Sequence, residues 1–193
     1  MHSLDILTIN ENPRGKEDLL EMIWNALNYF PEGTWGNINY IGNTVVKYDL
    51  TVEANGELSQ ALTFPKILRK LREMRGMFKT HTLLLGVTHD PVIVLYCRFE
   101  GNSFKRSVVT VHDYVSDDVG VLSFFQKDES VAIRIVAHGL GHNRGLEHHD
   151  EPIDLMFIGL LDGGRIELDG FCRSCIRKLR SRATQNTTRV AST

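Results

Sequence analysis

The segment Ala137–His149, AHGLGHNRGLEHH, contains four of the eight histidines of the chain and constrains its fold more than any other stretch. His138 and His142 are four residues apart, so on a helix both imidazoles project from one face, one turn apart. A tetrahedral zinc usually has a third protein ligand, which a straight helix does not supply from further along. Gly145 permits a left-handed turn at a helix end, and His148 follows three residues later. The spacing therefore predicts a zinc site formed by these three histidines.

Unrelated surface and core histidines are the alternative explanation of this pattern. A single histidine would be interpreted in that way, as a satisfied core or surface residue. Three histidines and a glycine at this spacing, however, arise from composition in roughly one chain per thousand. We therefore favour the metal site.

Composition narrows the class of protein and its partners. Of 193 residues, 42% are hydrophobic and 24% are charged, with a formal net charge of -2, so nothing favours binding to nucleic acid or a membrane surface. No apolar run approaches the about 20 residues that span a bilayer, and the first residues do not resemble a secretory signal. Three cysteines, an odd number, argue against a disulfide framework. We expect a cytoplasmic monomer.

Apolar and β-branched runs bounded by turn residues predict the strands. They are expected at Leu4–Ile9, Trp35–Val52 (one or two strands), His81–Val87, Val92–Phe99 and Arg106–His112. Cys97 lies in one of these runs and is interpreted as a buried small hydrophobic residue. The segment 116–127 is expected to be a loop with short structure.

Helical periodicity predicts four helices. Two amphipathic ones are expected over Glu17–Phe30 and from about Pro65, since proline is favoured near a helix start. A third, apolar on almost every side, should begin after the capping residue Asp128 and carry the first two histidines. A short basic helix over Cys172–Arg182 should precede a frayed tail.

The pattern H-x-x-x-H-x-x-G-x-x-H followed by a methionine resembles the metzincin clan of zinc peptidases. Archaemetzincins continue after the third histidine with C-x-x-x-x-C-x-M and later with F-C-x-x-C. Here His149 and Asp154 stand at the first two cysteine positions, Met156 follows in register, and FCRSC occupies residues 171–175. The chain is thus similar to the archaemetzincin family over about Leu4–Arg180, most specifically over residues 138–175.

This resemblance implies an α/β (α+β) fold of the metzincin type, in which a twisted mixed β-sheet with two packing helices lies above a central zinc-binding helix. One domain is expected over residues 1–193. Its N-terminal subdomain (1–145) would hold the sheet and the zinc helix, and its irregular C-terminal subdomain (146–193) the methionine turn and the CxxC helix. The cleft would run between them, with a strand within Arg106–His112 aligning an extended peptide. Gly145 and Met156 would be structural, the latter as an apolar floor beneath the zinc.

Gly139 stands where the family has its catalytic glutamate. Zinc on three neutral histidines would still polarise a carbonyl and bring the pKa of bound water to about 7. The glutamate's task is to carry a proton from the attacking water to the leaving amine, and losing such a group typically costs a factor of about 10² to 10⁴ in rate. Glu151 is a candidate substitute base, whereas Glu147 is expected to be a solvated surface residue.

Two functions therefore stay open. One is an archaemetzincin-like zinc metalloprotease of low activity that hydrolyses peptide or protein substrates with a zinc-bound water. The other is a catalytically inactive, zinc-dependent peptide-binding protein. A metal-stabilised domain without any function in a cleft is a third alternative.

Cys172 and Cys175 have the half-site spacing of a structural zinc, with a redox pair or two unconnected thiols as alternatives. The family resemblance implies a second zinc bound by four cysteines. Two of those positions are occupied here by His149 and Asp154, and both residue types bind zinc. A second zinc held by these four residues is one expectation. Loss of that metal, with free or disulfide-bonded cysteines, is the other.

Overall fold

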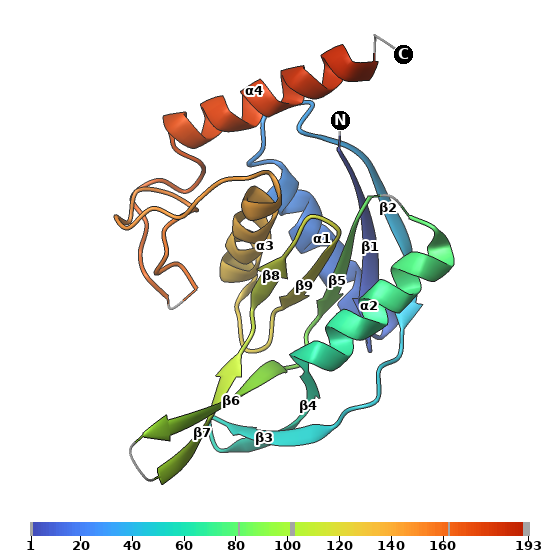
Figure 1. The fold of residues 1–193 in the computed structure, drawn as a ribbon, viewed down its shortest axis with the longest axis vertical. Coiled ribbons are helices and arrows are strands. Elements are labelled where there is room, and N and C mark those ends of the chain that lie inside the picture. Colours follow the sequence, from blue (N-terminus) through green and yellow to red (C-terminus); the bar gives the residue numbers. More distant parts are fainter. Residues whose placement is uncertain (1, 81, 101–102, 162, 191–193) are drawn as a thin grey trace.

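The computed structural model describes residues 2–80, 82–100, 103–161 and 163–190. Two helices are interspersed among the strands, and a third helix then leads into an irregular segment that ends in a further helix (Figure 1). In chain order the elements are β1 (His2–Ile9), α1 (Pro13–Leu27), β2 (Trp35–Thr44), β3 (Leu50–Ala54), β4 (Glu57–Thr63), α2 (Phe64–Phe78), β5 (Leu83–Thr88), β6 (Val92–Glu100), β7 (Ser103–Thr110), β8 (Asp113–Val115), β9 (Val119–Ser123), α3 (Glu129–Asn143) and α4 (Arg173–Val190).

Five described strands form the main sheet, in the order β2-β1-β5-β9-β8. The first four run parallel to one another, and β8 at the edge runs antiparallel to β9. Every residue of β5 and β9 is buried, because helices cover both faces of the sheet. The expected loop at 116–127 is therefore wrong in part. The run Val119–Ser123 is a central strand, and burial on both faces removes the polar alternation that would have predicted it.

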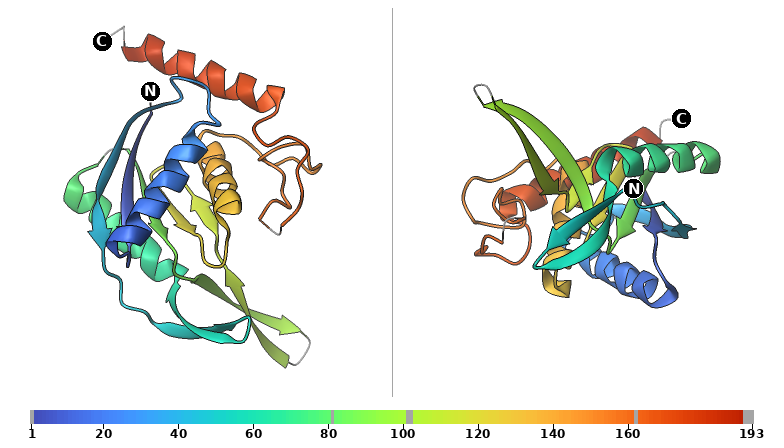
Figure 2. Two further views of the ribbon diagram at one scale, coloured as in Figure 1. Left: turned by 180° about the vertical axis from the view of Figure 1, so that it is seen from behind. Right: turned by 90° about the horizontal axis from the view of Figure 1, so that it is seen from below.

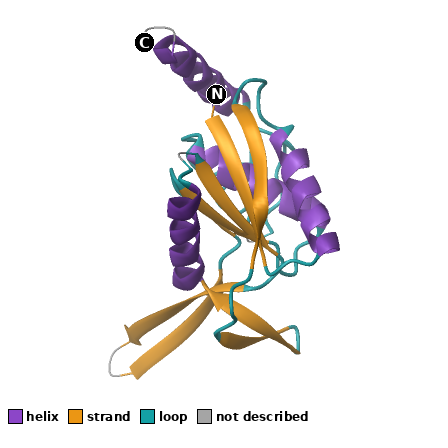
Figure 3. Ribbon diagram, turned by 90° about the vertical axis from the view of Figure 1, so that its right-hand side faces the viewer, coloured by secondary structure: helices purple, strands orange, loops and turns teal. Residues whose placement is uncertain are grey.

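Alternate residues of β1 point into two separate cores. Leu4 and Ile6 pack with α1 and α3 on one face, whereas Leu7 and Ile9 face α2 on the other. Figures 2 and 3 show α1 and α3 on one face of the main sheet and α2 on the other, from behind and from the side. The predicted α+β class, with a mixed sheet, two packing helices and a central helix, is confirmed.

A second, four-stranded sheet lies at one end of the molecule, in the order β3-β4-β6-β7. The outer part of the β6–β7 hairpin projects from the body (Figure 2, right). This corrects two expectations. Cys97 is exposed because its half of β6 leaves the core, and the strand within Arg106–His112 pairs with β6 rather than lying beside α3. The edge strand beside α3 is β8.

The last helix is longer than the sequence predicts. It continues past Arg182 to Val190, so most of the expected frayed tail is helical; residues 191–193, like His81 of the predicted strand His81–Val87, lie outside the described residues. Between α3 and α4 the chain is irregular, with one isolated bridge between His149 and Phe157. None of the described helices is both long and apolar enough to cross a membrane.

Candidate metal centres

The helix that carries the first two histidines is fixed at both ends. Asp128 caps its start by accepting a hydrogen bond from the backbone N–H of Val131, at 2.9 Å. Its end is a left-handed turn at Gly145, where φ is +74°. The N–H of Gly145 bonds to the carbonyl of His142 and that of Leu146 to the carbonyl of Gly141, the hydrogen-bond pair of a Schellman motif. This turn brings the chain back along the helix toward His148.

The three predicted ligands converge on one point. The Nε2 atom of His142 lies 3.1 Å from that of His138 and 2.9 Å from that of His148, and the latter two atoms are 3.2 Å apart. Zinc–nitrogen bonds of about 2.0–2.1 Å place neighbouring nitrogens of a tetrahedral site about 3.3 Å apart. The geometry of this His138/His142/His148 cluster therefore suits a single zinc ion.

Backbone carbonyls fix the orientation of two of these rings. Nδ1 of His138 lies 2.6 Å from the carbonyl oxygen of Leu155, and Nδ1 of His142 lies 3.0 Å from that of Leu146. A carbonyl only accepts, so in both rings Nδ1 carries the proton and Nε2 presents a lone pair. Two lone pairs that face each other repel, and a shared cation removes that repulsion.

Burial favours the neutral imidazoles that a metal requires. It lowers the pKa of His138, whose side chain is 1% exposed, and of His142. His148, by contrast, is exposed. The cluster is thus buried on the helix side and open to solvent on the side of its third member.

The packing of the irregular segment explains why the helix has a glycine at position 141. A Cβ atom on Gly141 would lie 2.8 Å from Sδ of the buried Met156, closer than such atoms approach. The glycine therefore lets the turn at Met156 pack directly against the helix. This contact also brings the Leu155 carbonyl within reach of His138.

A second group of potential ligands lies beside the first. Ligand atoms of His149, Asp154, Cys172 and Cys175 all lie within 4.8 Å of one another. Nε2 of His149 is 3.3 Å from Sγ of Cys175, 3.6 Å from Sγ of Cys172 and 3.5 Å from Oδ2 of Asp154. Both thiols are free. These side chains form the His149/Asp154/Cys172/Cys175 cluster, and their chemistry also suits zinc.

Asp154 is fully buried in this second cluster and is held rigidly. Its two carboxylate oxygens accept hydrogen bonds from the backbone N–H groups of Met156, at 2.8 Å, and Cys172, at 2.7 Å. Burial and the neighbouring Asp154 raise the pKa of Cys175 far above its usual range. A thiol in that position stays protonated unless a cation stabilises its thiolate form.

The candidate substitute base from the sequence, Glu151, is exposed and belongs to neither cluster. Glu147 is exposed as well, with Oε2 3.5 Å from Nζ of Lys178. The carboxylate beside the histidines is instead Asp113, on β8, with Oδ2 3.8 Å from Nε2 of His138. Burial raises the pKa of Asp113 to about 6, although His142 and His148 oppose the shift. No motif marks this residue, because only the pairing of β8 with β9 brings it to the helix.

Position 139 faces the same strand. A Cβ atom on Gly139 would lie 2.9 Å from Cγ2 of Val115 and 3.5 Å from Oδ2 of Asp113. The space beside the helix at this position is therefore already occupied by side chains of β8.

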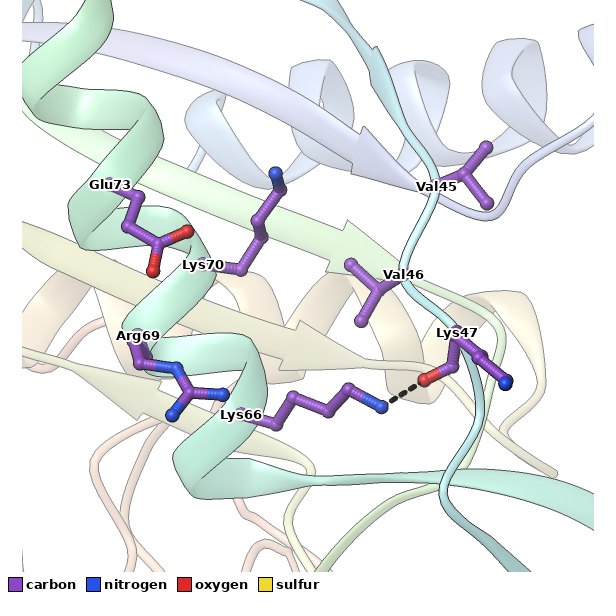
Figure 4. A pocket seen from close by; sticks show the side chains of 7 residues that line it. All are labelled: Val45, Val46, Lys47, Lys66, Arg69, Lys70 and Glu73. Carbon is purple, nitrogen blue, oxygen red and sulfur yellow. Dashed lines mark hydrogen bonds between the residues drawn. The ribbon is translucent and has the colours of Figure 1, made fainter.

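A separate pocket of about 210 Å³ lies between α2 and the β2–β3 connection (Figure 4). Its lining is mostly basic: Val45, Val46, Lys47, Lys66, Arg69, Lys70 and Glu73. Lys66 donates a hydrogen bond to the Lys47 carbonyl and lies 3.6 Å from Asp49. Because α2 covers the sheet face opposite α3, this pocket is not part of either cluster.

Comparison with known proteins reveals similarity in structure but not in sequence. No protein-family model matches the chain, and no curated protein matches it. An archaemetzincin from Methanopyrus kandleri superposes with a TM-score of 0.59 at 18% identity, over 95% of this chain and 96% of that one. A zinc-dependent peptidase from Methanocorpusculum labreanum gives 0.53 at 20% identity, over 91% and 99%. An archaemetzincin from Archaeoglobus fulgidus, complexed with malonate, gives 0.51 at 16% identity, over 91% and 99%.

These similarities extend over nearly the whole length of each chain. The resemblance expected from residues 138–175 is therefore confirmed at the level of the fold. The chain has the fold of the archaemetzincins.

Proposed function

We propose that the chain is a zinc-dependent peptidase in which His138, His142 and His148 bind the metal. The observation that carries this proposal is the convergence of three Nε2 atoms, two of which present lone pairs because their Nδ1 atoms donate to backbone carbonyls. The fold supports it, since a zinc-dependent peptidase and two archaemetzincins share it. Peptides or proteins are the proposed substrates, and the proposed state is a cytoplasmic monomer.

Zinc at this cluster would polarise a peptide carbonyl and lower the pKa of a water molecule. The chain's own residues prepare the ion for that task. Three neutral imidazoles leave it with its full positive charge, and the carbonyls of Leu155 and Leu146 hold the rings of His138 and His142 in place. The exposed position of His148 leaves that side of the cluster accessible to a substrate.

The edge strand β8 is the proposed guide for the substrate. It pairs with β9 on one side and ends the main sheet, immediately beside the helix that carries the histidines. An extended peptide can add to such an edge by main-chain hydrogen bonds. A peptide aligned in this way would pass in front of the cluster with its carbonyl groups exposed to the metal.

The His149/Asp154/Cys172/Cys175 cluster is the proposed site of a second, structural zinc. Four ligands fill a tetrahedral site and leave no position for a substrate. Its role would be to fix the irregular segment that supplies Leu155 and Met156 to the first cluster. Met156 would form the apolar floor expected for a methionine turn.

A second candidate function is zinc-dependent peptide binding without hydrolysis. The observation in its favour is Gly139, because no carboxylate projects from the helix at the position where the family has its base. Both functions require the same metal ligands and the same edge strand. They differ only in whether a peptide is cut.

The test is to load the protein with zinc and assay a mixed library of short peptides, with metal content measured by elemental analysis. Hydrolysis that disappears in His142→Ala together with one equivalent of zinc would support the peptidase. Zinc binding with peptide binding but no hydrolysis would favour the second candidate. A protein that takes up no zinc would refute both.

A further inference from the structure

The space next to Gly139 contains a carboxylate that comes from another element. A Cβ atom at position 139 would lie 3.5 Å from Oδ2 of Asp113, on β8. That oxygen is also 3.8 Å from Nε2 of His138. A carboxylate therefore lies beside the proposed metal ligands on the side toward which a residue at position 139 would project, although the helix does not supply it.

The carboxylate of Asp113 is available for a hydrogen bond from a group outside the protein. Among the described residues no group donates a hydrogen bond to it, and the nearest ring nitrogen is that of His138. The side chain of Asp113 is nevertheless only 12% exposed. A largely buried carboxylate without a donor is unfavourable unless something else, such as a water or substrate N–H, hydrogen-bonds to it.

Asp113 does not belong to the group of candidate metal ligands. The ligand atoms that all lie within 4.8 Å of one another come from the three histidines and do not include Asp113. The carboxylate stands beside this group rather than within it. That separation suits a group that contacts a water next to the ion, which is what a general base requires.

The strand holds Asp113 in this position through several contacts. Asp113 pairs with Leu122 of β9, and the preceding residue is anchored by the bond from the Ser123 N–H to the His112 carbonyl, at 3.0 Å. Nδ1 of His112 also lies 3.1 Å from the carbonyl of Ser123. A side chain on a paired strand is positioned more rigidly than one in an exposed loop, such as Glu151.

We propose that Asp113 is the catalytic carboxylate of this site, supplied by the edge strand instead of the zinc helix; this rests on the proposed peptidase function. Asp113 takes a proton from the attacking water as its oxygen bonds to the peptide carbonyl carbon. It then gives the proton to the amide nitrogen as the C–N bond breaks. One water is consumed, and a carboxylic acid and an amine are released.

The proposal also gives a physical reason for glycine at position 139. Any side chain there would meet Val115 and would approach Asp113. A glutamate would add a second negative charge next to the first, which disfavours the ionised form of both. Gly139 and Asp113 thus form a matched pair, in which the absence of one side chain makes room for the other.

Acetohydroxamic acid is the probe that tests this role without requiring turnover. It binds a metal as its anion and passes its proton to an adjacent carboxylate. We expect Asp113→Asn to keep its zinc and its fold but to bind the probe about 10–100-fold more weakly, as for loss of a hydrogen bond to a charged group. Peptide hydrolysis should fall by about 10² to 10⁴. Asp117→Asn, an equivalent change at an exposed residue two positions after β8, is the control and should change neither quantity.

Two further variants make the test decisive. Glu151→Gln should behave like the control; if it alone weakens binding and hydrolysis, the base is Glu151 and the proposal is wrong. The triple variant Asp113→Asn, Val115→Ala, Gly139→Glu returns the carboxylate to the helix and should restore affinity for the probe. If Asp113→Asn is harmless, or if the triple variant folds, binds zinc and restores nothing, Asp113 does not carry the proton.

The two proposals fail in distinguishable ways. A natural protein that cuts no peptide, but loses affinity for acetohydroxamic acid in Asp113→Asn, would refute the peptidase and with it a catalytic role for Asp113, while showing that Asp113 accepts a proton beside the metal. If the natural protein and its Asp113→Asn variant cut peptides equally fast, the peptidase is supported and the role of Asp113 is refuted.

Discussion

The His138/His142/His148 cluster and the His149/Asp154/Cys172/Cys175 cluster are neighbours in sequence and in space, yet they are built differently. The first has three candidate ligands of one kind, all histidines, one of them exposed, and a carboxylate beside them. The second has four ligands of three kinds, and its buried Asp154 is bound by two backbone N–H groups. Three ligands leave a coordination position open for chemistry, whereas four close the site. Ligand number and exposure together therefore separate a proposed reactive centre from a proposed structural one.

Removing a ligand from the His138/His142/His148 cluster, here called the open cluster, should have the largest effect on activity. We expect His142→Ala to lose one zinc and to reduce peptide hydrolysis by a factor of about 10³ or more, because the metal supplies several kcal/mol of transition-state stabilisation. The midpoint of thermal unfolding should change less in His142→Ala than in a variant that lacks a ligand of the His149/Asp154/Cys172/Cys175 cluster. Elemental analysis, activity assays and calorimetry test this. A variant that keeps its activity would contradict the assignment of the reactive metal to this cluster.

Removing a ligand from the His149/Asp154/Cys172/Cys175 cluster, here called the closed cluster, should mainly affect stability. Cys175 is buried, so Cys175→Ala loses both packing and the proposed structural metal, and we expect the free energy of unfolding to fall by about 3 kcal/mol or more. Cys97→Ala is the matched control, because that thiol is exposed on the projecting hairpin. Denaturant unfolding measures both. Equal stability of the two variants would argue against a metal in the closed cluster.

Restoring the family's glutamate tests how the open cluster is packed. Gly139→Glu alone should lower both activity and stability, because its Cβ would lie 2.9 Å from Cγ2 of Val115 and overpacking typically costs about 1–3 kcal/mol. Gly139→Ala separates the steric part from the charge. Kinetics and thermal unfolding of both variants decide the matter. A single Gly139→Glu variant that is stable and more active than the natural protein would contradict the assignment of Asp113.

The smallest expected effect concerns the pair of Glu11 and His89, which lies outside both clusters and contributes its own pH dependence to the stability. Hydrogen bonds and charge attraction from Glu11 raise the pKa of His89 above 6.5. Burial raises the pKa of Glu11, but its bonds to His89 lower it overall. A raised histidine pKa stabilises the fold below pH 6.5, and this contribution disappears as the pH rises through the folded value.

The stabilisation from this pair should therefore be present between about pH 4.5 and 6.5 and decline on either side. Because His89 is partly exposed, we expect His89→Gln to cost less than about 1 kcal/mol at pH 5.5 and less still at pH 8. Unfolding of zinc-loaded protein at both pH values tests this. A cost that grows toward pH 8 would show that another group controls the response.

The sequence predicts short-range features well and long-range placement poorly. The spacing of the first three histidines predicts the first ligand set, because a helix turn and a glycine turn are local geometry. The family resemblance implies the second set, and the structure brings the side chains of each set together. Asp113 was missed, since its place depends on the pairing of β8 with β9. The strand β9 was missed because burial on both faces removes any alternation. Cys97 was misplaced because an apolar hairpin can leave the core.

Three consecutive residues, Asp154, Leu155 and Met156, connect the two clusters. The first belongs to the closed cluster, the second holds the ring of His138, and the third packs against Gly141 of α3. Occupancy of one proposed centre is therefore expected to influence occupancy of the other. An ion that orders this tripeptide reduces the entropic cost of binding for its neighbour, so the two metals should bind cooperatively. By thermodynamic linkage, whatever factor the first ion adds to the affinity for the second, the second adds to the affinity for the first.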